Sequence, residues 1–184
     1  MMGVTHVLIG LAVTLPLSLF GPWAFEPVAI GAIVGGAVPD LDLLVGSHRR
    51  TFHYPVFGPM VALVTVVGVL IVPTPATVGV AAAVVAAGVH AASDVLGAGN
   101  ELRPWERTNT DAVYDHLRGR WIRARYVVRY DGSPEDLLLA IIAAIPVVVV
   151  HGNTVRWVVG VLVLVGTIYT LLRKRLVTYF ARIV

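Results

Sequence analysis

Long, nearly uncharged apolar runs are the feature that most limits what this chain can fold into. Such runs occupy residues 1–20, 56–72, 76–96, 134–150 and 154–172. A helix needs about 20 apolar residues to cross the hydrocarbon core of a bilayer, and several of these runs approach that length. With 57% hydrophobic and 14% charged residues, the chain has too little polar surface to cover the runs in water. The sequence therefore predicts a polytopic membrane protein.

A shorter apolar run at residues 27–38 decides the topology. It is rich in Gly and Ala, and Gly31 and Gly35 form a G-x-x-x-G pattern that permits close helix packing. The run is long enough to span a bilayer only if its helix continues towards Leu44, and we expect that it does. The predicted fold class is an all-α integral membrane protein with about six transmembrane helices. Residues 1–184 form a single polytopic domain in this interpretation.

One long polar segment, residues 97–133, interrupts the apolar pattern. Within it, residues 122–130 alternate apolar and basic side chains, which is the period-2 pattern of a strand. We therefore expect a short β segment there. Asp111, Asp115 and His116 form an acidic cluster at helical spacing, which is typical of a solvated face.

The basic residues predict the orientation in the membrane. They gather at Arg49-Arg50, in the 97–133 segment and at residues 173–175, whereas the turns near residues 74 and 152 carry almost no charge. The positive-inside rule then places both termini, the polar segment and any active site on the cytoplasmic side of a multi-pass cell-membrane protein. A net charge of +3 in such a chain points to membrane lipid as a partner, and we expect no nucleic acid.

Most of the chain's metal-binding side chains fall on this predicted cytoplasmic face. The chain has no cysteine, so a metal would have to bind His, Asp or Glu. His90 and Asp94 lie four residues apart and so project from one face of a helix. Five further donors lie near the start of the chain or shortly after Pro39, and the candidate ligands are His6, Asp40, Asp42, His48, His53, His90 and Asp94.

The donor set predicts metal-assisted hydrolysis. It is large enough for about one to three divalent ions, with zinc the expected metal, and paired ions can generate hydroxide at neutral pH and stabilise charge on a phosphoryl oxygen. Asp40 and Asp42 are the expected catalytic carboxylates, and Arg49 and Arg50 would take part by holding an anionic substrate group. Two more arginines of the period-2 segment, Arg123 and Arg125, would bind phospholipid headgroups, although a positive-inside surface explains them equally well.

The ordered motifs resemble those of the YdjM/YbcI-type family of membrane-bound metal-dependent hydrolases. The matching elements are Thr5-His6, Pro39-Asp40-Leu41-Asp42, residues 48–53, the His90–Asp94 pair and Gly132-Ser133-Pro134-Glu135. The family is similar in its donor pattern to zinc-dependent phospholipase C and the P1-type nucleases. That resemblance implies an α-helical fold, a zinc cluster and hydrolysis of a phosphoester substrate. The sequence departs from the family pattern at Arg50, where a glycine is usual, and in the loop after Asp94.

Two other functions remain open on the sequence alone. A metal-ion or proton transporter would need polar groups near the bilayer midplane, whereas the donors here fall at helix ends. A non-catalytic membrane scaffold would use its arginine-rich segment to hold lipid or an acidic partner. The leading hypothesis is a membrane-embedded hydrolase of a lipid or lipid-linked phosphoester.

Overall fold

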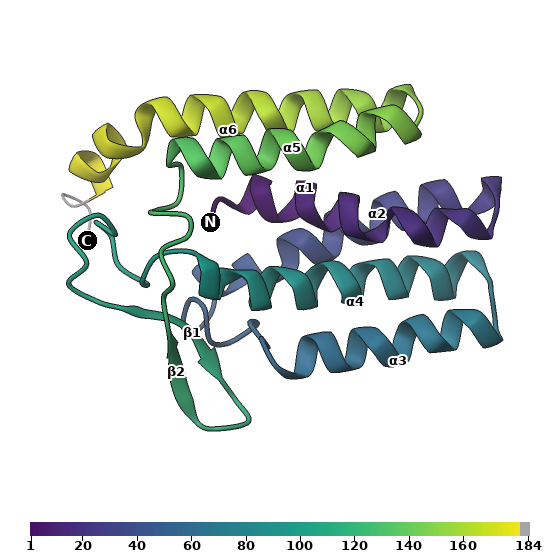
Figure 1. The fold of residues 1–184 in the computed structure, drawn as a ribbon, viewed down its shortest axis with the longest axis horizontal. Helices are drawn as coiled ribbons and strands as arrows, with labels where there is room; N and C mark the ends of the chain where they lie inside the picture. Colours follow the sequence, from purple (N-terminus) through teal and green to yellow (C-terminus); the bar gives the residue numbers. More distant parts are fainter. Residues whose placement is uncertain (181–184) are drawn as a thin grey trace.

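Six α-helices lie along one axis in residues 1–180, the part of the chain that the computed structural model describes (Figure 1). Their bounds are α1 Gly3–Thr14, α2 Phe25–Ala37, α3 Phe57–Ile71, α4 Pro75–Ser93, α5 Pro134–Val150 and α6 Asn153–Phe180. Helix α4 packs against α1, α2 and α3, while α1 also packs against α5, and α5 packs against α6. The predicted all-α fold is therefore confirmed.

The predicted continuation of the short apolar run is also confirmed. Within the described residues, four helical segments are long and apolar enough to cross a membrane: Gly3–Phe20, Pro22–Leu43, Pro75–Leu96 and Asn153–Tyr179. The second of these joins α2 to 3₁₀ turns on either side, Pro22–Ala24 and Val38–Leu43. Helices α3 and α5, at 15 and 17 residues, are shorter but lie in the same bundle (Figure 1).

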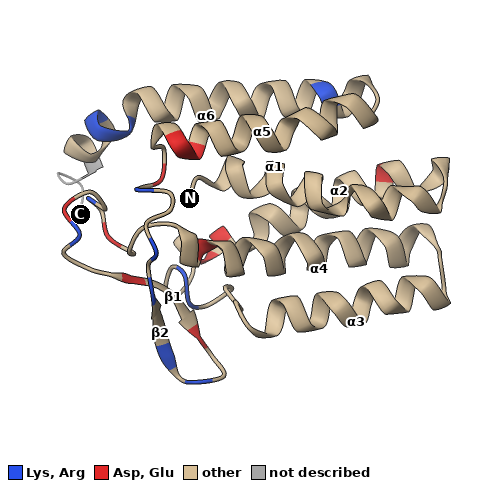
Figure 2. Ribbon diagram, viewed as in Figure 1, with Lys and Arg blue, Asp and Glu red and all other residues tan. Residues whose placement is uncertain are grey.

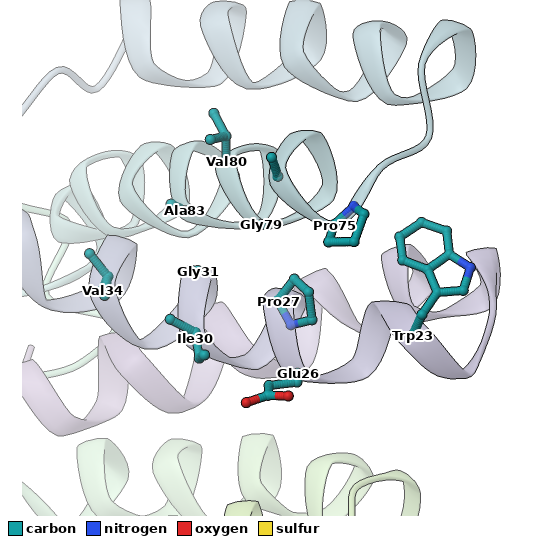
Figure 3. Close-up of a pocket in the computed structure, with 11 residues that line it drawn as sticks. Trp23, Glu26, Pro27, Ile30, Gly31, Val34, Pro75, Gly79, Val80 and Ala83 are labelled. Carbon is teal, nitrogen blue, oxygen red and sulfur yellow. The ribbon is translucent and has the colours of Figure 1, made fainter.

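Glycines let α2 and α4 approach closely. A Cβ atom added at Gly31 would lie 2.1 Å from the carbonyl oxygen of Gly79, and one at Gly35 would lie 1.9 Å from that of Ala83. No side chain fits at such distances, so the G-x-x-x-G pattern sets this interface. Figure 3 shows the Gly31 and Gly79 backbones facing one another across the groove between the two helices.

Local sequence fixes the ends of the helices near the polar face. Pro39 has no N–H and so cannot continue the α-helical hydrogen-bond ladder of α2, and the chain tightens into the 3₁₀ turn Val38–Leu43. With three residues per turn, Asp40 and Asp42 leave this turn in different directions. At the opposite end, Thr74 and Thr77 form a reciprocal capping box that starts α4.

The polar segment contains a two-stranded antiparallel sheet of β1 Asp111–Asp115 and β2 Arg120–Arg123. The predicted β segment is present, but the expected strand over residues 122–130 is wrong beyond Arg123. Tyr126 has a positive φ of 53°, and the N–H groups of Arg125 and Val128 donate to carbonyl oxygens of residues 95 and 96 instead of a strand partner. The helical spacing read into residues 111–116 is also wrong, because Asp111 and Asp115 lie on β1.

Charged side chains concentrate at one end of the bundle. Figure 2 shows Lys, Arg, Asp and Glu gathered around the sheet and the loops beside it, whereas the helices carry very few. The N-terminus and the last turns of α6 lie at this same end (Figure 1). The structure thus has the basic segments at one end of the bundle, as the sequence predicts.

Candidate metal centre

Four separate segments bring their His and Asp side chains together at the charged end of the bundle. His6 lies in the first turns of α1, and the 3₁₀ turn after α2 supplies two carboxylates. The loop before α3 supplies two imidazoles, and the end of α4 supplies His90 with Asp94 just beyond it. The structure thus gathers the seven sequence-predicted ligands, which are His6, Asp40, Asp42, His48, His53, His90 and Asp94.

His90 is held in a fixed orientation by the backbone of α2. Its Nδ1 lies 2.7 Å from the carbonyl oxygen of Gly36, and a carbonyl can only accept, so Nδ1 carries the proton. The same glycine lets α1 and α2 approach closely, because a Cβ at Gly36 would lie 2.8 Å from the Cα of Val7. The ring of His6 stacks on His90 with centroids 3.7 Å apart and planes 11° from parallel. Such close stacking disfavours two positively charged rings.

Asp42 orients two further histidines at once. One carboxylate oxygen accepts from Nδ1 of His48 at 2.8 Å, and the other accepts from Nδ1 of His53, also at 2.8 Å. Carboxylates that bind the far nitrogen of a metal-ligating histidine fix its tautomer and its direction. Asp42 was predicted as a ligand and a catalytic group, and the structure places it behind the imidazoles.

The inward-facing nitrogens of His53 and His90 meet carboxylates. Nε2 of His90 lies 3.4 Å from Asp40 Oδ1 and 3.7 Å from Asp94 Oδ2. Nε2 of His53 lies 3.2 Å from Asp94 Oδ2 and 3.8 Å from Asp40 Oδ1. Both Nε2 atoms are buried, and neither has a hydrogen-bond partner among the described residues.

These contacts test whether the residues fit a metal. In a neutral ring whose Nδ1 donates, Nε2 is a lone-pair acceptor, and here it faces an acceptor-only carboxylate. A cation between the two groups turns this unfavourable arrangement into ligation, and buried polar atoms otherwise have partners. Imidazole nitrogen and carboxylate oxygen are the ligands that zinc and similar divalent ions bind. The donor set therefore fits a divalent metal.

The donors form two groups, and within each group the ligand atoms all lie within 4.8 Å of one another. The first consists of His6, His90 and Asp94, all buried, and the second of Asp40, His48 and His53. The groups touch, because His53 and His90 are in edge-to-face contact with centroids 5.0 Å apart. The described residues could thus hold two neighbouring ions.

Fixed positive charges offset part of the acidic character of the centre. The Arg49 guanidinium is buried 3.9 Å from Asp94 Oδ1, and the amino group of Met1 lies 3.4 Å from the same oxygen. Burial lowers the pKa of His48 despite its hydrogen bond to Asp42. Burial acts in the same direction on His53, but the nearby carboxylates of Asp94 and Asp42 outweigh that effect and raise its pKa.

The four predicted substrate-binding arginines lie in different surroundings. Arg49 donates to the carbonyl oxygen of Ala98 at 2.6 Å, so part of its guanidinium is used to hold the polar segment. Arg50 is exposed and stacks on the ring of Tyr114 at 4.4 Å. Arg123 and Arg125 are exposed on and after β2. The structure therefore brings Arg49 alone of these four to the donor cluster in the described part of the chain.

Sequence reasoning missed three groups that support the cluster. They are the carbonyl oxygen of Gly36, the hydroxyl of Ser93, 3.3 Å from His6 Nδ1, and the side chain of Asn100, which donates to the carbonyl oxygen of His48 at 3.2 Å. The G-x-x-x-G pattern was a signal for the first, because it shows that α2 lies against another helix. Ser93 stands three residues after His90 and could have been found by helical spacing.

A cavity of about 920 Å³ adjoins the cluster, and Asp40, His48 and Arg49 line one side of it. A second hollow, of about 660 Å³, lies between α2 and α4 near the other end of the bundle (Figure 3). Its lining has no histidine, and Glu26 is the one carboxylate there. The first cavity is therefore the one that gives access to the donors.

Comparison with known proteins gives one match. The model of the YdjM inner membrane protein family matches residues 1–177. No curated protein and no solved structure matches the chain.

Proposed function

The chain belongs to the YdjM inner membrane protein family, and on that premise we propose that it is a membrane-embedded, metal-dependent hydrolase of a lipid or lipid-linked phosphoester. The observation that carries the proposal is the pair of buried Nε2 atoms, on His53 and His90, that face the carboxylates of Asp40 and Asp94 without a hydrogen-bond partner in residues 1–180. A divalent ion, for which zinc is proposed, would supply nucleophilic water at neutral pH and offset charge on a phosphoryl oxygen.

The protein's own residues have distinct roles in this proposal. His6, His90 and Asp94 hold one ion, and Asp40, His48 and His53 hold the other. Asp42 keeps both Nδ1–H groups of its histidines pointed outward, so that their Nε2 lone pairs face the site. Helix ends and a 3₁₀ turn position His6, Asp40 and the His90–Asp94 pair, and the carboxylate of Asp42 holds the two loop imidazoles.

Asp40 is the carboxylate best placed to move a proton. Its side chain is 26% exposed, whereas those of Asp42 and Asp94 are buried. Oδ1 faces the two imidazoles, and Asp40 lines the adjoining cavity. It would accept the proton of the water whose oxygen forms the new bond to phosphorus, while the ester P–O bond breaks and the departing alkoxide takes up a proton.

Arg49 would attract the phosphate. It lines the same cavity and is buried beside Asp94. A guanidinium in a partly desolvated site holds a phosphate more strongly than an exposed one does. Arg50, stacked on Tyr114, is proposed to support the fold of the loop instead of binding substrate.

The proposed orientation places this centre on the cytoplasmic side. Arg49 lies beside Asp94, and the sheet and the last turns of α6, with most of the other basic residues, lie at the same end of the bundle (Figure 2). Because the chain has no cysteine, single introduced cysteines can report sidedness without background. A membrane-impermeant maleimide should label Gly152→Cys in intact cells and Leu117→Cys only after lysis.

The activity is tested in proteoliposomes that contain lipid phosphoesters. We expect release of a phosphorylated or dephosphorylated product that a chelator abolishes and zinc restores. Asp40→Asn should lower kcat by about a hundredfold or more, because it removes both the base and a ligand. Asp111→Asn, a carboxylate on β1, is the matched control and should leave kcat unchanged. Metal flux without turnover of any ester would instead favour a transporter.

A further inference from the structure

The cavity beside the donor cluster has two walls of different chemistry. On one side it is lined by Asp40, His48 and Arg49, and the polar segment adds residues 99–102. The other side is formed by the start of α1 and by α6, with Val4 and Val165 among its lining residues. At about 920 Å³ it is within the usual size range of a ligand pocket, which is roughly 300–1,000 Å³.

The apolar wall is continuous with the exposed apolar surface of the candidate membrane-spanning segments. Val165 lines the cavity and is 47% exposed, and Leu43, which also lines it, is 64% exposed. Both belong to segments long and apolar enough to span a membrane. The cavity therefore extends from the carboxylate of Asp40 to exposed apolar residues on segments of membrane-spanning length.

Two of the other charged side chains that line the cavity, Arg173 and Asp131, are paired with one another. Arg173 donates through Nε and Nη2 to the two carboxylate oxygens of Asp131, at 2.8 and 3.0 Å. Tyr169 donates to the same carboxylate, which ties the polar segment to α6. These groups fix the far wall, so the Arg49 guanidinium and the Met1 amino group are the lining cations that lie beside the donors.

We propose that this cavity is a lateral entrance through which a membrane phospholipid reaches the donors directly from the bilayer. Its phosphate would lie at Asp40, His48 and Arg49, while its acyl chains would pass between Leu43 and Val165 and stay among the lipids. An amphipathic ligand matches both walls. A soluble phosphoester would leave the apolar side chains in contact with water, and a hydrocarbon would leave the polar groups without hydrogen-bond partners. This inference rests on the proposed function for its substrate class and names the route that the substrate takes.

The test measures lipid occupancy separately from hydrolysis. Protein stripped of metal is placed in nanodiscs that contain a phospholipid with a diazirine in its acyl chain near the headgroup, and cross-links are mapped by mass spectrometry. We expect cross-links at the peptides around Leu43 and Val165. Val165→Trp and Leu43→Trp should each lower cross-linking there by about fivefold, because the larger side chain fills the gap.

Neighbouring substitutions serve as controls. Leu164 and Leu44 are 58% and 81% exposed and do not line the cavity, so Leu164→Trp and Leu44→Trp should leave the cross-links unchanged. Equal cross-linking in all four variants would overturn the proposal. All four substitutions are at exposed positions, and monodisperse gel filtration confirms that each variant is folded.

A second measurement uses metal-loaded protein. Val165→Trp should lose turnover of vesicle phospholipid while keeping turnover of bis(p-nitrophenyl) phosphate, which is soluble and needs no passage from the bilayer. Loss of both activities to the same extent would contradict a lateral route. If the wild type hydrolyses no ester at all, the proposed function fails, and the cross-linking result still decides whether lipid occupies the cavity.

Discussion

Replacing Asp42 with asparagine tests how the imidazoles are held. The carboxylate accepts one hydrogen bond from Nδ1 of His48 and one from Nδ1 of His53, each 2.8 Å long. An asparagine keeps one carbonyl oxygen and presents an NH₂ donor where the other oxygen was. One of the two rings therefore loses its acceptor and must rotate or move its proton to Nε2, the atom that should bind the metal.

The expected loss of metal affinity in Asp42→Asn can be estimated from the role of Asp42 in orienting the two imidazoles. Loss of such a carboxylate behind a ligating histidine typically lowers metal affinity by about 10- to 100-fold. That range corresponds to roughly 1.4–2.7 kcal/mol of binding free energy. The folded protein without metal should lose less stability, because the asparagine still accepts one of the two hydrogen bonds.

The dissociation constant is measured in detergent by competition with a fluorescent zinc chelator. Asp111→Asn removes a carboxylate from β1 and controls for the general change in charge. Asp42→Asn should weaken zinc binding within the range above, and Asp111→Asn should not. Wild-type affinity in Asp42→Asn would refute the idea that Asp42 orients the imidazoles, and an equal loss in Asp111→Asn would show that the effect is not local.

Three further substitutions test the fold around the centre. Gly35→Ala should lower the free energy of unfolding by about 1–3 kcal/mol, measured by thermal scanning in detergent, because its Cβ would lie 1.9 Å from the carbonyl oxygen of Ala83. Arg49→Met should lower it by roughly 3–5 kcal/mol, since it leaves the buried charge network with one partner missing. Asp115→Asn should lower the melting temperature at pH 7: hydrogen bonds, first that from the Arg118 side chain, outweigh burial and lower the pKa of Asp115 below its ordinary 3.8. The stabilisation is thus present above pH 3.8 and is lost as the pH falls below that value, where the two melting curves should converge.

Each of these three substitutions has a control. Gly160 on α6 has no atom within 4 Å of an added Cβ, so Gly160→Ala should leave stability unchanged or slightly higher, and an equal loss there would remove the packing argument. Arg103 pairs with Glu106 at the surface, and Arg103→Met should cost less than about 1 kcal/mol. A difference between wild type and Asp115→Asn that persists unchanged to pH 2 would contradict a role for the charged carboxylate.

The sequence was sufficient for the helices and for the gathering of the donors. The lengths of the apolar runs predict the helices of the bundle. The positions of the basic residues then predict that the segments around Asp40, His53 and His90 lie at the same end of it. The family resemblance read from the ordered motifs is confirmed by the match over residues 1–177.

The finer geometry depends on contacts that no spacing encodes. A D-x-D pattern does not say which carboxylate faces the site, and the 3₁₀ turn after Pro39 sends Asp42 behind two imidazoles instead of beside Asp40. Arg49 has a left-handed backbone with φ of 60°, which turns its side chain towards the carbonyl oxygen of Ala98. Such a conformation depends on the surrounding fold and leaves no local pattern in the sequence.

The sheet shows the same limit. Strand β1 was missed because its partner, β2, lies across a turn and its short sequence also fits helical spacing. The alternation after Arg123 suggested a longer strand, but the N–H groups there donate to carbonyl oxygens of residues 95–97, just after α4. Pairing between segments, which a period-2 pattern cannot specify, decided both outcomes.

Elemental analysis of protein purified without chelator tests the central claim most directly. Wild type should carry at least one divalent ion per chain, and His90→Ala and Asp94→Ala should each lose most of it. His151→Ala removes another buried histidine, in the turn between α5 and α6, and should keep the wild-type metal content. Wild-type protein without stoichiometric metal, or an unchanged metal content in the His90 and Asp94 variants, would contradict the account.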